Sequence, residues 1–103
     1  MSAPQDLPAD IAVFAGTFES QPLVFAHLLD EAPNLDFDQI EVLQDRGIRK
    51  RLEGFFPPET VTRLLVALDE DDTLVLLMPD AGVFPGSARL TPLGFAQGTL
   101  RRA

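Results

Sequence analysis

Few residues of this chain could carry out chemistry at a fixed site, and the first candidate is its only histidine, His27. General acid–base catalysis would require a carboxylate close to the imidazole in a pocket. Asp30 and Glu31 follow about one helical turn later, within side-chain reach on a helix. A histidine on the flank of a helix more commonly caps or packs, and we expect that role for His27.

Three hydroxyl side chains, Ser20, Thr60 and Ser87, are candidate nucleophiles, but none lies in the G-x-S-x-G turn that presents a catalytic serine. The glycines of residues 82–86 (GVFPG) are not followed by Lys and Ser or Thr, so they do not indicate a phosphate-binding loop. The chain has no Cys, which excludes disulfides, thiolate metal sites and a cysteine nucleophile. The sequence therefore predicts no catalytic residue, no cofactor and no enzymatic activity.

The acidic run of residues 69–72 (DEDD) offers the oxygen ligands that a hard divalent cation prefers. It lacks the alternating carboxylates and the central glycine of a calcium loop. A single His without Cys also argues against a transition-metal site. We therefore expect a solvated acidic turn and no metal site.

Charge is distributed unevenly along the sequence, whose formal net charge is -8. Residues 1–45 contain no Lys or Arg, whereas Arg46, Arg49, Lys50 and Arg51 follow almost together. An acidic protein of this kind is a poor ligand for nucleic acid or an anionic membrane, and it suits a cationic protein partner. For the basic cluster we expect salt bridges with the preceding acids.

Four acidic residues of the middle segment are the predicted partner-binding residues: Asp36, Asp38, Glu41 and Asp45. If residues 37–45 form a helix, three of them share one face of it. Complementary charge on such a face would speed encounter with a basic partner and reject wrong ones. The alternative is an ordinary solvent-exposed face.

The order of the predicted helices and strands, which would position these residues, indicates an α+β fold. We expect a small antiparallel or mixed sheet with two to three helices packed on one face. We expect a flexible lead-in over residues 1–9 and a single domain over residues 10–100. Strands are predicted over residues 11–18, 73–78 and 88–97, and helices over residues 20–29 and 58–68. The first strand is apolar on both faces, which indicates a central strand covered twice. It could lie between the two later strands.

Two segments of the sequence are compatible with more than one structure. Residues 37–45 fit a short helix ending at Arg46 and Gly47, which we favour, although residues 39–44 also fit an edge strand. The last strand contains Pro92 and Gly94, and because Pro cannot donate to a sheet ladder, that strand lies at an edge or carries a bulge.

Phenylalanines suggest two other surfaces. Phe55, Phe56 and Phe84 could line a small-molecule pocket beneath the loop of residues 82–86, since ligand pockets are mostly apolar. A homo-oligomer could instead form through the Phe-bearing loops or through the edge strand that ends near Phe95.

Three short motifs resemble a family of small bacterial immunity proteins, which neutralise polymorphic toxins delivered between competing cells. Residues 16–20 (GTFES) follow the first strand, residues 45–48 (DRGI) lie mid-chain, and residues 93–95 (LGF) lie in the last strand. The resemblance implies an α+β fold, a binding function without catalytic residues, and a toxin domain, often a basic nuclease, as partner.

Residues 1–10 lack the basic and apolar regions of a signal peptide, and the longest apolar run, residues 74–79, is too short to span a bilayer. We therefore expect a cytoplasmic location. The leading hypothesis is a small, acidic, non-enzymatic domain that binds another protein.

Overall fold

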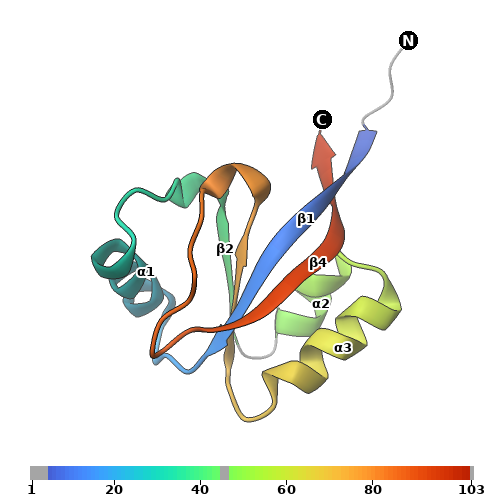
Figure 1. Ribbon diagram of the computed structural model, residues 1–103. Helices are drawn as coiled ribbons and strands as arrows, with labels where there is room; N and C mark the ends of the chain where they lie inside the picture. Colours follow the sequence, from blue (N-terminus) through green and yellow to red (C-terminus); the bar gives the residue numbers. More distant parts are fainter. Residues whose placement is uncertain (1–4, 45–46, 103) are drawn as a thin grey trace.

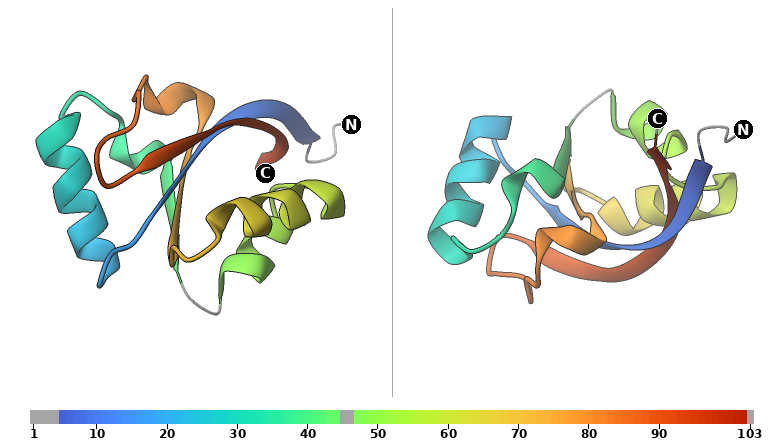
Figure 2. Two further views of the ribbon diagram at one scale, coloured as in Figure 1. Left: turned by 60° about the horizontal axis from the view of Figure 1, so that its bottom comes forward. Right: turned by 90° about the horizontal axis from the view of Figure 1, so that it is seen from above.

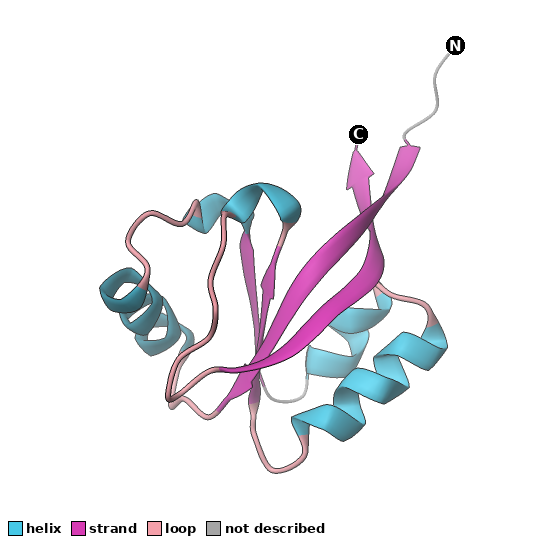
Figure 3. Cartoon of the chain, in the orientation of Figure 1, coloured by secondary structure: helices cyan, strands magenta, loops and turns pink. Residues whose placement is uncertain are grey.

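An α+β arrangement is present in the computed structural model, which describes residues 5–44 and 47–102 (Figure 1). A four-stranded antiparallel sheet and three α-helices lie within these residues, as Figure 3 shows by colour. The elements are β1 (Gln5–Gly16), α1 (Gln21–Glu31), β2 (Ile40–Gln44), α2 (Ile48–Glu53), α3 (Pro58–Leu68), β3 (Thr73–Leu77) and β4 (Thr91–Arg102), with short 3-10 turns η1 (Phe37–Gln39) and η3 (Pro79–Ala81).

The strand order is β2-β3-β1-β4, so β1 lies between the two later strands, an arrangement that the sequence allowed but did not determine. Its register pairs Ala12 with Leu77 of β3 and with Phe95 of β4. β1 begins at Gln5, and residues 5–9 are therefore strand, not the flexible lead-in that we expected. Residues 1–4 lie outside the described part of the chain.

Both faces of the sheet are covered, which corrects the expectation that the helices share one face. Alternate residues of β1, such as Ile11 and Val13, are buried against α2 and α3. Phe14, the next residue after Val13, is buried on the opposite face with Val24 and Leu28 of α1. Figure 2 shows α1 on one side of the sheet and α2 and α3 on the other. The reason is that β3 is buried at every position, so either face left open would expose apolar side chains to water.

The segment that we favoured as a helix is the strand β2, so the helix prediction for residues 37–45 is wrong there. β2 lies at the sheet edge and pairs with all of β3, from Ile40 opposite Leu77 to Gln44 opposite Thr73. The backbone of β3 needs hydrogen-bond partners on that side, and this tertiary demand outweighs a weak helical pattern. Gly47 is the N-cap of α2 and not the end of a helix.

The two long helices, α1 and α3, follow the sequence pattern. α3 begins at Pro58 and buries Val61, Leu64 and Leu68 on one stripe, as predicted. α1 begins after Ser20, although the Ser20 side chain makes no capping hydrogen bond. None of the helices within the described residues is both long enough and apolar enough to cross a membrane.

β4 lies at the edge of the sheet and is irregular, as Pro92 and Gly94 predicted. Val13 pairs with Gly94 and Phe14 with Pro92, so Leu93 is the extra residue of a bulge. Gly94 has φ +89°, a conformation that side chains disfavour. The pairing of β1 with β4 continues well past the end of β3, and the two strands project as a ribbon (Figure 1).

Candidate functional site

The predicted acidic residues do not share a helix face, because residues 40–44 form a strand. The Asp36 carboxylate caps η1, where its Oδ1 accepts a hydrogen bond from the backbone N–H of Asp38 at 3.1 Å. Glu41 lies in β2 and its Oε2 is 2.7 Å from Nη2 of Arg51, the internal salt bridge expected of the basic cluster. Asp45 lies outside the described residues. Asp36 and Asp38 thus lie together at η1, and the carboxylates of Asp36 and Glu41 already have partners.

The three phenylalanines of the predicted pocket are not brought together. Phe56 is buried in the core between the sheet and α2 and α3, with Phe55 packed against that core. Phe84 is buried on the other face of the sheet, with its ring centroid 5.1 Å from that of Phe14. A shared pocket under the 82–86 loop is therefore not formed. Phe84 instead lines a hollow of about 480 Å³ beside Leu35.

His27 is held in a structural contact. Its Nε2 lies 2.7 Å from Oγ of Ser87, which also accepts hydrogen bonds from the backbone N–H groups of Arg89 and Leu90. The Ser87 hydroxyl thus joins the imidazole of His27 to the backbone of residues 89 and 90. The ring also packs on Phe18, at 5.6 Å between centroids. These contacts match the packing role expected of His27, and its partner is Ser87, not Asp30 or Glu31.

The acidic turn of residues 69–72 fastens the end of β1. Asp71 Oδ1 accepts a hydrogen bond from Thr17 Oγ1 at 2.8 Å. Asp72 Oδ1 accepts from the backbone N–H of Phe18 and from Thr73 Oγ1, at 3.1 and 2.7 Å. Within residues 5–44 and 47–102 no three His, Asp or Glu side chains are grouped so that they could hold a metal ion.

The outer edge of β4 was considered from the sequence only as a surface for a homo-oligomer. No strand of the described residues pairs with this edge. Residues 91–99 (TPLGFAQGT) contain no charged side chain, in a chain of which 23% is charged. Phe95, in the middle of this stretch, is 72% exposed. Natural proteins normally protect such an edge with charge, Pro or a covering loop, and between Leu93 and Gln97 this edge has only the bulge.

The opposite edge of the sheet provides a contrast. β2 is five residues long, carries the charged Glu41, and the carbonyl of Val42 accepts a hydrogen bond from the side chain of Gln21 at 3.0 Å. Short length, charge and a covering helix are the usual means of protecting an edge. The protein therefore protects one edge of its sheet and leaves residues 93–97 of the other edge free.

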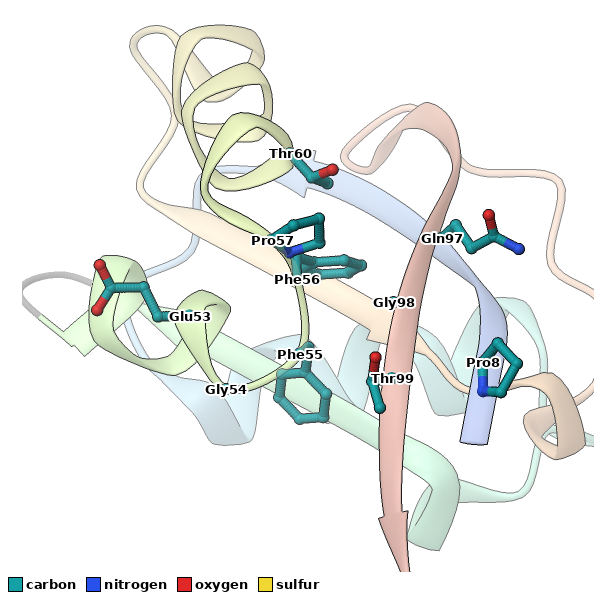
Figure 4. A pocket seen from close by; sticks show the side chains of 10 residues that line it. All are labelled: Pro8, Glu53, Gly54, Phe55, Phe56, Pro57, Thr60, Gln97, Gly98 and Thr99. Carbon is teal, nitrogen blue, oxygen red and sulfur yellow. The ribbon is translucent and has the colours of Figure 1, made fainter. Parts of the chain in front are cut away.

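A groove of about 730 Å³ lies where β4 meets the segment between α2 and α3 (Figure 4). Figure 4 shows Phe55, Phe56 and Pro57 facing Gly98 and Thr99 of the strand. The backbone N–H of Thr99 donates to the carbonyl of Phe55 at 2.8 Å, which closes the β4 edge at that point. The remaining lining comes from Pro8, Glu53, Gly54, Thr60 and Gln97.

Gly98 is required for this closure. A Cβ at Gly98 would lie 2.7 Å from the Phe55 carbonyl oxygen and 2.8 Å from Cε1 of the Phe56 ring. Such distances are well inside van der Waals contact, so the loop can approach the strand only because residue 98 has no side chain.

A second, smaller hollow lies near the start of β4. Its volume is about 270 Å³, and Thr91 and Leu93 of the strand line it together with Ala67 of α3. The rest of its lining includes the acidic residues Asp69, Glu70 and Asp71. The uncharged edge thus runs between two hollows, one lined by Glu53 and the other by three acidic side chains.

Comparisons of the chain with models of protein families, with curated proteins and with solved structures find no match.

Proposed function

We propose that this protein acts by binding another protein and not as an enzyme. The observation that carries the proposal is the edge of β4, which is free of charge over nine residues and exposes the Phe95 ring. An exposed aromatic side chain beside unpaired backbone groups is a common basis for protein recognition. The contacts of His27 and Ser87 support a non-catalytic role, because each group has a structural partner.

A narrower form of the proposal is a toxin-neutralising immunity protein. Two features support it: the net charge of -8, which suits a basic toxin domain, and the short motifs at residues 16–20 and 93–95. Such a protein would meet its toxin in the cytoplasm. The alternative of a small-molecule pocket lined by Phe55, Phe56 and Phe84 receives no support, because these rings lie on opposite faces of the sheet.

The test is affinity capture from a lysate of the source organism with the tagged protein, followed by identification of the retained proteins. The wild type is compared with Phe95→Asp and with the matched control Val66→Asp. Val66 is 73% exposed, against 72% for Phe95, but it lies on α3, so both variants add one carboxylate to an equally exposed apolar position.

The expected result is a partner that the wild type and Val66→Asp retain and that Phe95→Asp loses. Retention of no partner by the wild type would contradict the proposal of a binding protein. Equal retention by all three variants would place the binding surface elsewhere and remove the observation on which the proposal rests.

A further inference from the structure

The direction of the backbone groups on β4 shows where a partner could bind. The Thr99 N–H points away from β1, because it donates to Phe55. Alternate residues of a strand present their backbone groups to the same edge, so Gln97 and Phe95 present theirs outward as well. Within the described residues, no backbone bond outside the sheet ladder involves either of them. The edge is therefore open from the bulge at Leu93 to Gln97.

Each end of this open edge has at least one exposed carboxylate beside it. Glu53 lines the groove at the Gln97 end, and it is exposed. Asp69 and Glu70, both exposed, line the hollow at the Leu93 end. The strand between Leu93 and Thr99 spans about 20 Å at about 3.3 Å per residue. Cations separated by this distance would each lie near carboxylates.

Near the middle of the edge the nearby charge is positive, not negative. Thr60 and Ala67 of α3 line the two hollows, and Arg63 lies between them along the same flank of the helix, exposed to solvent. A further cation at the centre would be repelled by Arg63. On the opposite face of the sheet, the exposed Phe95 ring offers an apolar surface to a neighbouring strand.

Building on the proposed binding function, we infer that the partner supplies an extended segment that adds to the sheet along β4, with basic residues at both ends and uncharged, partly apolar residues between them. Backbone hydrogen bonds to Phe95 and Gln97 hold the segment. An apolar side chain packs beside Phe95, and the terminal cations lie near Glu53 and Asp69. A second copy of the chain is disfavoured as occupant, because it would bring another eight negative charges.

The inference is tested with a synthetic heptapeptide, acetyl-Lys-Thr-Val-Thr-Val-Thr-Lys-amide, titrated into uniformly ¹⁵N-labelled protein. Chemical shifts of all backbone amides are followed, and the dissociation constant is fitted. Three peptides serve as controls: one with Gln at both ends, one with Glu at both ends, and one with Pro in place of the central Thr. The first two change only charge, and the third removes a backbone donor and disfavours the paired strand.

We expect saturable shifts centred on the amides of Phe95 and Gln97. Binding should be about three- to tenfold weaker for the Gln-ended peptide, as two exposed ion pairs are lost, and undetectable for the Glu-ended and Pro-containing peptides. The variants Glu53→Gln and Asp69→Asn should each weaken only the Lys-ended peptide. Val66→Asp should leave the titration unchanged.

Saturable shifts away from β4, equal affinity for Lys-ended and Glu-ended peptides, or no saturable shift would each overturn the inference. So would a dimer of the free protein that Phe95→Asp dissociates in sedimentation experiments, because the edge would then serve self-association. These outcomes are distinct from failure of the proposed function. A partner captured by the wild type and not displaced by the heptapeptide would retain the binding function while refuting this mode.

Discussion

Replacement of Gly98 by alanine tests the geometry of the groove directly. The added Cβ would lie 2.7 Å from the Phe55 carbonyl oxygen and 2.8 and 2.9 Å from Cε1 and Cδ1 of Phe56. Phe56 is only 5% exposed, so its ring cannot swing into solvent without opening the core. Either the ring or the 54–57 segment must move, and the hydrogen bond from Thr99 to Phe55 is strained with it.

The expected cost follows from these contacts. Insertion of one methyl group into a well-packed site usually costs about 1–3 kcal/mol of unfolding free energy. For a domain of this size, this corresponds to a drop in Tm of about 4 °C or more. The chain has no Trp and no Tyr, so unfolding in urea is best followed by far-UV circular dichroism.

Phe56→Leu provides the matched test of the mechanism. Alone it should cost about 1–2 kcal/mol, because a buried ring is replaced by a smaller side chain. In that background Gly98→Ala should be less costly by about 1 kcal/mol, since one of the two clashes is relieved. The clash with the Phe55 carbonyl would remain, so the rescue is partial.

Gly47→Ala is the control, because no atom lies within 4 Å of the added Cβ and φ at Gly47 is -81°. Its unfolding free energy should stay within about 0.5 kcal/mol of the wild type. The reasoning would be refuted if Gly98→Ala were as neutral as this control, or if its cost were the same with Leu as with Phe at position 56.

Three further predictions concern side-chain contacts. Ser87→Ala should lower the unfolding free energy by about 1–2 kcal/mol, since Oγ bonds two backbone N–H groups and His27, whereas Ser20→Ala should have little effect because that side chain makes no capping bond; urea titration compares the two. Asp72→Ala should cost about 1–3 kcal/mol and Asp72→Asn much less, because Asn retains an oxygen that accepts from Phe18 and Thr73; equal losses in thermal melts would argue against this role. Glu41→Gln should cost less than about 1 kcal/mol, with the difference from wild type shrinking as salt is added, because both members of the pair with Arg51 are more than one-third exposed.

Much of the fold could be predicted because local patterns agreed with tertiary demands. Val61, Leu64 and Leu68 recur at helical spacing and form the buried stripe of α3. The Pro and Gly of the last strand correctly indicated an edge with a bulge. For residues 37–45 the helix was favoured over the edge strand that residues 39–44 also fit, because the local pattern is ambiguous and the hydrogen-bonding requirement of β3 decides the outcome.

The candidate site could be predicted less well, for a related reason. Phe55, Phe56 and Phe84 look equivalent in the sequence, but the sheet separates them, and only the packing on its two faces reveals this. The uncharged run of residues 91–99 is the sequence feature that indicates the free edge. From the sequence, the strand end near Phe95 was predicted only as a surface for self-association. The lack of a partner strand beyond β4 depends on strand order, which the sequence does not encode locally.

The position of β1 in the sheet also has a consequence for how the chain folds. Its partners are distant in sequence: Ala12 pairs with Leu77, and Gln5 pairs with Arg102. Proteins dominated by such non-local pairs fold slowly, because long loops must close before the contacts form. During synthesis on the ribosome, this strand, apolar on both faces, stays unpaired until β3 and β4 emerge, and for that interval its apolar side chains are exposed to aggregation.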